Sequence, residues 1–200
     1  MKRILSLTVT LALLLVAAYV IAKESLQEEM EIYDKTLRLH IPANSDSAED
    51  QAVKLKVRDT VIAYLSEPLS NCSTKDEAVQ KVQDLSTNIT LLANNVLKSN
   101  GFDYTARVSV VLEDYPTRDY EGISLPAGEY TSLKIELGEA KGQNWWCVLF
   151  PQVCVGTARP TEALAEVGFT PNQIRVLTDH DDYEYVVKFK LLEIFEGIFK

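Results

Sequence analysis

The spacing of apolar residues changes at Asn100-Gly101, and this change restricts the chain to a fold that combines helices with a sheet. Before it, apolar residues recur every three to four positions over residues 47–65 and 74–99, as they do in amphipathic helices. After it, Tyr104–Glu113 and Tyr130–Leu137 alternate apolar and polar residues, as half-buried strands do. Two helices are therefore expected to be followed by strands.

Two further strands are predicted, one at Leu37–Ile41 and one at Trp145–Phe150. One strand, two helices and then several strands define an α+β two-layer sandwich, with the first strand and both helices packed on a mainly antiparallel sheet. Pro68 is expected to stop the first helix. Asn100-Gly101 is expected to cap the second, because both residues tolerate the left-handed conformation.

The last third of the chain gives weaker patterns. Residues 156–171 look irregular, with one helical turn near 162–167. Ile174–Thr178 and Tyr183–Val187 are predicted to pair as a hairpin. Lys188–Lys200 is predicted to close the domain as a C-terminal helix that is apolar over most of its circumference.

The first 22 residues are expected to lie outside the fold, because MKR is followed by 19 uncharged, mostly apolar residues. They read as a signal peptide cleaved after Ala22, or as an uncleaved anchor in which residues 4–22 contact the membrane. Residues 23–35 read as a polar spacer. Residues 36–200 are then a single extracytoplasmic α+β domain, secreted or N-terminally anchored.

The net negative charge of the chain argues against nucleic acid and anionic lipid as partners. Without Lys2 and Arg3 the chain has 18 basic and 29 acidic residues, a net charge of -11. Such a surface repels nucleic acid and anionic lipid. No phosphate-binding loop, dinucleotide fingerprint or GxSxG motif is present, so no cofactor is expected. The cluster Asp179-His180-Asp181-Asp182 lacks the ligand spacing of a metal loop and reads as a solvated turn.

The stretch ANSDSAED, residues 43–50, contains two overlapping capping boxes, Asp46 with Glu49 and Ser47 with Asp50. Asn44 and Ser45 are turn residues between the first strand and the first helix. His40 is expected on the polar face of that strand. The density of polar groups is thus explained by a well-specified corner, without chemistry.

Cys147 and Cys154 are a candidate disulfide pair in an oxidising compartment. A bridge requires the chain to turn back between them, and Phe150-Pro151, where an aromatic residue before proline raises the chance of a cis bond, is a suitable place. Two buried thiols are the alternative. Cys72 would remain as a free or partly buried thiol.

A catalytic alternative uses Cys147 as nucleophile with His40 or His180 as base, in an exported thiol hydrolase. Trp145 and Trp146 beside the cysteine are mildly suggestive of such enzymes. However, no glycine-rich nucleophile turn precedes Cys147, and a bridge to Cys154 would disarm it. The sequence therefore favours a protein without a catalytic site.

Trp145 and Trp146 follow one another in a predicted strand, so they face opposite sides of the sheet. One of them could be an exposed interface anchor beside Asn144. Packing of both, one on each side of a covered sheet, is the alternative.

Two long motifs resemble the stage II sporulation protein R family. They are LRLHIPANSDSAEDQAVKLKVRD and TRDYEGISLPAGEYTSLKIELGEAKGQNWWCVLFPQVC, which lie between Leu37 and Cys154. Ala140 stands where the family motif has a small glycine, and Gln152-Val153 replaces a Pro-Leu pair. Residues 156–200 match only loosely.

The resemblance implies a sporulation signal exported from the forespore to the septal intermembrane space. There it would be required to activate a membrane-embedded aspartic peptidase of the mother cell, which processes the sigma-E precursor. The resemblance supplies no catalytic residues. From the residues themselves we expect the partner contact at Asn44, Ser45, Asp46, Asn144, Trp145 and Trp146. A purely structural septal component is a further alternative.

Overall fold

A computed structural model of the chain describes residues 31–120, 122–153 and 160–178, together with residues 13, 16, 19, 20 and 23. Its contacts group residues 33–200 into one compact unit and residues 1–32 into another.

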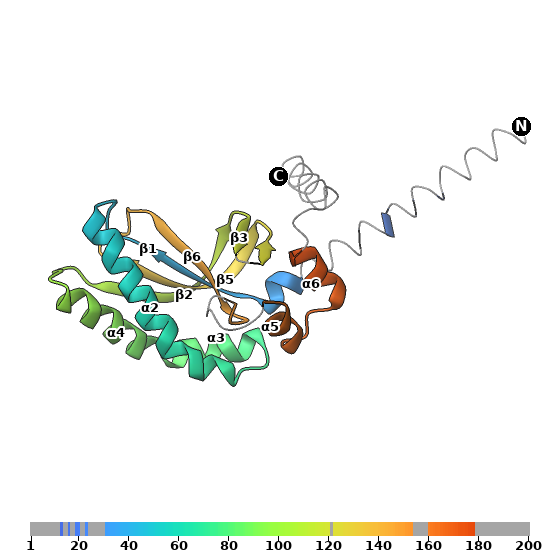
Figure 1. Cartoon of the computed structure of the whole chain (residues 1–200), viewed down its shortest axis with the longest axis horizontal. Helices are drawn as coiled ribbons and strands as arrows, with labels where there is room; N and C mark the ends of the chain where they lie inside the picture. Colours follow the sequence, from blue (N-terminus) through green and yellow to red (C-terminus); the bar gives the residue numbers. More distant parts are fainter. Residues whose placement is uncertain are drawn as a thin grey trace, which may run out of the picture. The chain divides into compact units, whose positions relative to one another are not determined.

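A four-stranded mixed sheet forms the centre of this unit (Figure 1). Its order is β2-β5-β1-β6, with β1 parallel to β5 and the other two pairs antiparallel. A separate two-stranded sheet is formed by β3 and β4. The strands are β1 (Leu37–Pro42), β2 (Ala106–Tyr115), β3 (Arg118–Tyr120), β4 (Ile123–Leu125), β5 (Gly128–Leu137) and β6 (Asn144–Phe150).

Three helices lie together on one side of the sheet (Figure 1). They are α2 (Ala48–Ser70), α3 (Lys75–Asp84) and α4 (Ser86–Ser99). The core lies between the two layers, where Leu39 and Ile41 of β1 meet Val57 and Val61 of α2, all fully buried. Two short helices follow the sheet, α5 (Pro160–Glu166) and α6 (Pro171–Thr178). The predicted α+β sandwich on a mainly antiparallel sheet is confirmed.

The helix boundaries differ from the prediction in two places. The first helix passes Pro68 and ends at Ser70, which buries Leu69 to 1% exposure. The predicted second helix is broken at Leu85, which caps both α3 and α4. The break lets each half turn its own apolar side to the core, and the Gly101 cap is confirmed by its φ of +83°.

The predicted strand at Ile174–Thr178 is wrong, because residues 171–178 form α6. Thr170 and Gln173 make a reciprocal cap, in which the Thr170 amide donates to Oε1 of Gln173 and the Gln173 amide donates to Oγ1 of Thr170. Pro171 then fits the first helical turn. The predicted strand Tyr183–Val187 and helix Lys188–Lys200 lie outside the described residues.

The end of the predicted polar spacer belongs to the folded unit. Residues 31–35 are helical. The Tyr33 ring packs edge-on against Tyr130 at 4.8 Å, and its hydroxyl donates to the Ala127 carbonyl at 3.0 Å. An aromatic side chain with a hydrogen-bonded hydroxyl anchors this segment, which composition alone assigned to a linker.

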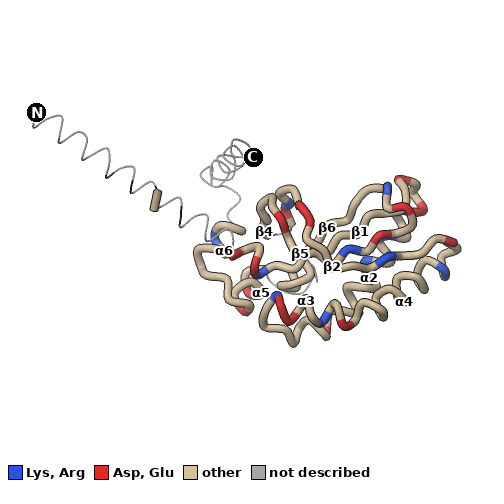
Figure 2. The backbone as a smooth tube through the Cα atoms, turned by 180° about the vertical axis from the view of Figure 1, so that it is seen from behind, with Lys and Arg blue, Asp and Glu red and all other residues tan. Residues whose placement is uncertain are grey.

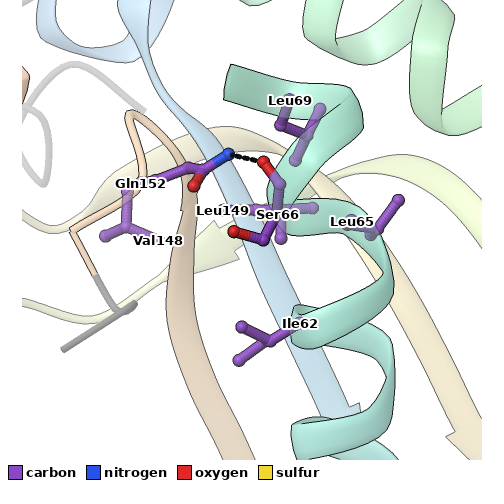
Figure 3. Close-up of a pocket in the computed structure, with 7 residues that line it drawn as sticks. All are labelled: Ile62, Leu65, Ser66, Leu69, Val148, Leu149 and Gln152. Carbon is purple, nitrogen blue, oxygen red and sulfur yellow. Dashed lines mark hydrogen bonds between the residues drawn. The ribbon is translucent and has the colours of Figure 1, made fainter. Parts of the chain in front are cut away.

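A small apolar pocket lies between α2 and the end of β6 (Figure 3). Gln152 closes it by donating from Nε2 to the Ser66 carbonyl at 2.7 Å. The pocket holds about 10 Å³, room for at most one water. The Phe150-Pro151 bond beside it is cis, the isomer whose chance the aromatic residue before proline raises. The pocket is therefore a packing feature rather than a ligand site.

Candidate functional site

The corner between β1 and α2 is built around the buried carboxylate of Asp50. Asn44 Nδ2 donates to Asp50 Oδ2 at 2.8 Å, Ser45 Oγ donates to the same oxygen at 2.5 Å, and the Tyr104 hydroxyl donates to Oδ1. Burial favours the neutral acid, but these hydrogen bonds outweigh it and lower the pKa of Asp50. The predicted Ser47 cap is confirmed, since its Oγ accepts from the Asp50 amide.

The same corner holds the loop that connects β5 to β6. Asn44 Oδ1 accepts from the Glu139 amide at 2.9 Å, and Asp46 Oδ1 accepts from the Gln143 amide at 2.7 Å. Gly142 passes so close that an added Cβ would lie 2.2 Å from the Ser45 carbonyl oxygen. The corner residues are thus occupied in fixing the start of β6.

The sheet register brings the corner and the tryptophan strand together. Pro42 lies opposite Asn144, and His40 lies opposite Trp146. The residues predicted as partner contacts, which are separated by about a hundred positions in the sequence, therefore meet at one end of β1 and β6.

Trp145 and Trp146 face opposite sides of the sheet, as predicted. Trp145 packs against the helix layer, with the Arg58 guanidinium 4.1 Å from its ring centroid. Trp146 lies on the other face, stacked on His40 at 3.7 Å with 15° between the rings. Both side chains are half-buried. Because they point apart, a partner meeting one face of the sheet touches only one of them.

His40 is the centre of a polar cluster on the face opposite the helices. Its Nδ1 lies 3.0 Å from Glu113 Oε2, and its Nε2 lies 2.9 Å from Asn144 Oδ1. Lys134 Nζ donates to Glu113 Oε2 at 3.0 Å. Both imidazole nitrogens lie within hydrogen-bond distance of side-chain oxygens. The imidazole is therefore occupied on both sides.

Arg38 extends this cluster into a cage of tyrosines. The side chain is fully buried, and its guanidinium lies 4.2 Å from the Tyr115 ring centroid and 4.8 Å from that of Tyr130. Nε donates to the Cys147 carbonyl at 3.2 Å, and a terminal nitrogen donates to the Tyr120 hydroxyl. Nη1 has no hydrogen-bond partner in the described chain. Aromatic faces replace a carboxylate as the main stabilisation of this buried charge.

The sequence reading missed Glu113 and Arg38. The available signal was alternation, because Arg38 and His40 share one side of β1 while Glu113 and Tyr115 share one side of β2. The pairing order β2-β5-β1 was needed to place those sides together.

The proposed catalytic pair of Cys147 and His40 is not formed. Cys147 lies opposite Leu39 and faces the helix layer at 3% exposure, whereas His40 faces the other side of the sheet. His180, the other base considered, and Cys154, the predicted bridge partner, both lie outside the described residues. The bridge stays a prediction.

The described residues contain no group of three His, Cys, Asp or Glu side chains placed to hold a metal ion. They also contain no helix that is long and apolar enough to cross a membrane. Figure 2 shows Lys and Arg interspersed with Asp and Glu along the described chain.

The fold and the cluster define a class of protein: a small α+β domain with helices on one face of a mixed sheet and a hydrogen-bonded aromatic cluster on the other. Residues 33–159 match the family described as stage II sporulation protein R. The chain is also 33% identical over 172 residues to stage II sporulation protein R of Bacillus subtilis (strain 168), covering 83% of this chain and 77% of that protein.

The chain belongs to the stage II sporulation protein R family. The resemblance seen in the sequence is confirmed, and with it a family named for sporulation and not for an enzymatic activity. No solved structure matches the chain. Residues 160–200 lie beyond the family match, in line with their looser resemblance.

Proposed function

We propose that this chain is an exported sporulation signal that activates a membrane-embedded aspartic peptidase of the mother cell by direct contact outside the cytoplasm. The peptidase would then process the sigma-E precursor. Membership of the stage II sporulation protein R family carries this proposal. The uncharged run of residues 4–22 supports export, and Leu13, Val16 and Tyr19 within it are helical and exposed.

The contact surface that we propose consists of Asn44, Ser45, Asp46, Asn144 and Trp146. Asn144 and Asp46 are exposed, and the Trp146 ring lies over His40 beside them. Internal hydrogen bonds fix the corner, so little side-chain freedom is lost when a partner binds. Trp145 is left out of this surface, because it packs on the helix side under Arg58.

A ligand activates an enzyme only if it binds the active state more tightly than the inactive state. A rigid surface with one aromatic anchor suits this role, because the anchor fits a pocket that exists in one state only. The Cys147–Cys154 bridge, which we propose as well, would fix the chain just after β6.

The test is replacement of Trp146 by alanine in a sporulating strain. We expect sigma-E processing to be lost while the exported protein accumulates at its normal level, measured by immunoblot of the exported fraction. Trp146→Phe, which keeps an aromatic ring over His40, should retain part of the signal. Normal processing in Trp146→Ala at normal protein levels would exclude Trp146 from the contact.

A further inference from the structure

The outer edge of β2 has no strand beside it in the described chain. β2 pairs with β5 over ten consecutive residues, without the register shift seen between β1 and β6. It contains no proline and no lysine, and the five residues at its centre, from Val108 to Leu112, carry no charge. Proteins usually protect an edge strand with a bulge, a proline, a lysine or another charged residue, because an unprotected edge pairs with other chains.

The register shows which backbone groups point outward from β2. The Gly138 amide donates to the Thr105 carbonyl at 3.0 Å, and these two residues lie directly opposite because Ala106 lies opposite Leu137. In an antiparallel pair, hydrogen-bonded and non-hydrogen-bonded residues alternate. The odd-numbered residues of β2 therefore bond to β5, and the even-numbered residues point their amides and carbonyls outward.

One observation confirms this assignment. The amide of Ala106, an even-numbered residue, donates to Asn94 Oδ1 of α4 at 2.8 Å rather than to β5. The outward groups of Val108, Val110 and Leu112 have no such side-chain partner among the described residues. The backbone amides and carbonyls of these three residues therefore point outward, where they can pair with another strand.

Apolar surface flanks this edge on the helix side. Leu112 is 67% exposed and Leu91 is 57% exposed, the two highest values among the large apolar side chains of the described domain. Leu91 precedes Asn94 by three positions in α4, so both lie on the same side of that helix. Since Asn94 reaches the β2 edge, Leu91 lies near it as well.

We propose that two copies of this chain pair through their β2 edges, antiparallel, about a two-fold axis at Val110. Even-numbered residues must face even-numbered residues, because only these carry outward groups. Centring the axis on Val110 places Arg107 opposite Glu113 of the other copy, twice, and Leu112 opposite Val108. Moving the register by two residues places Arg107 opposite Val111 or Tyr115, so that Glu113, which also binds His40 and Lys134 of its own chain, no longer faces a cation of the other copy.

Opposite charges and apolar side chains in directly facing positions stabilise a strand pair. The resulting interface is self-complementary, as a two-fold contact between identical chains requires. The occupant of the edge is therefore a second copy of this chain. If the proposed function holds, such a dimer presents two contact surfaces on one continuous sheet, which suits the pairing of two peptidase molecules.

The experiment is sedimentation equilibrium of the full-length chain in density-matched detergent, over a range of concentrations and without the peptidase. We expect a dimer whose dissociation constant rises at least about tenfold in the double variant Arg107→Glu, Leu112→Lys, which places like charges opposite each other. Leu55→Lys, on an exposed position of α2, is the matched control and should dimerise as the wild type does.

A second variant tests the register. Val110→Cys should give a disulfide-linked dimer under mild oxidation, and Leu55→Cys should not. A monomeric wild type, or a double variant that dimerises normally, would overturn the proposal. Because the peptidase is absent, either result leaves the proposed signalling function standing, and that function fails separately if Trp146→Ala signals normally.

Discussion

The imidazole Nδ1 of His40 lies 3.0 Å from Oε2 of Glu113, although 73 positions separate the two residues. They come from β1 and β2, which are not paired with each other in the sheet, and they meet across the face of β5. Lys134 of β5 completes the group through its bond to Glu113. The strand between β1 and β2, which is β5, thus supplies Lys134 as the third member of the cluster that His40 and Glu113 form.

Glu113 makes the stability of the fold dependent on acid pH. Burial raises its pKa, but hydrogen bonds from His40, Ser132 and Lys134 and the charge of His40 outweigh this and lower the pKa to about 2. A depressed carboxyl pKa contributes stability above the ordinary value of 4.5 and loses it as pH falls toward 2. The contribution is on the order of 3 kcal/mol.

We therefore expect the free energy of unfolding to fall between pH 4.5 and pH 2, and Glu113→Gln to reduce that slope, with the lowered pKa of Asp50 supplying part of the remainder. Urea unfolding at a series of pH values measures this. Glu136→Gln, at a more exposed position on β5, is the control. An unchanged slope in Glu113→Gln would place the acid sensitivity elsewhere.

The two tryptophans should differ in their effect on stability. Trp145→Ala removes packing against the helix layer and the contact with Arg58, and we expect a loss of about 2–4 kcal/mol. Trp146→Ala removes a stack on the other face, and we expect about 1–2 kcal/mol. Chemical denaturation of both variants checks the order, and a larger loss for Trp146 would contradict the assignment of faces.

Ala140 lies in the left-handed region, with φ of 54°. Glycine reaches this region without the steric cost that a Cβ adds, so Ala140→Gly should stabilise the fold by about 1 kcal/mol. Thermal unfolding measures the shift. The same change at Ala52, in the second turn of α2, should instead destabilise the protein. A decrease of the melting temperature in Ala140→Gly would show that the turn gains nothing from glycine.

A substitution at Gly142 tests the close contact between the β1–α2 corner and the loop that leads into β6. A Cβ there would lie 2.2 Å from a backbone oxygen of Ser45, which cannot move aside as a flexible side chain can. We expect Gly142→Ala to cost more than about 2 kcal/mol. Gly101→Ala is the comparison, because its φ is +83° but no atom lies within 4 Å of the added Cβ. Equal losses would mean that the contact with Ser45 yields.

Thiol labelling tests the bridge. We expect alkylation of the exported protein without reductant to modify one cysteine, Cys72, which is free. Burial raises the pKa of the Cys72 thiol and slows its reaction, so labelling should be done in denaturant and read by intact mass. Three labelled cysteines would exclude a bridge between Cys147 and Cys154.

The local patterns of the sequence were enough for the class of fold, the positions of the main strands, the Ser47 cap and the opposite orientation of the two tryptophans. Each depends on neighbours within four residues, which periodicity and capping rules describe. The same local reading failed at Ile174–Thr178, where a Thr170–Gln173 cap and Pro171 decided for a helix.

The tertiary structure alone decided the composition of the cluster. Arg38, His40, Glu113 and Trp146 come from three strands, and only the order β2-β5-β1-β6 and its register place them on one face. It likewise separated Cys147 from His40, although they lie one register position apart. Pairing order arises from how whole layers bury their apolar faces, a property of the assembled sheet that no short stretch of sequence encodes.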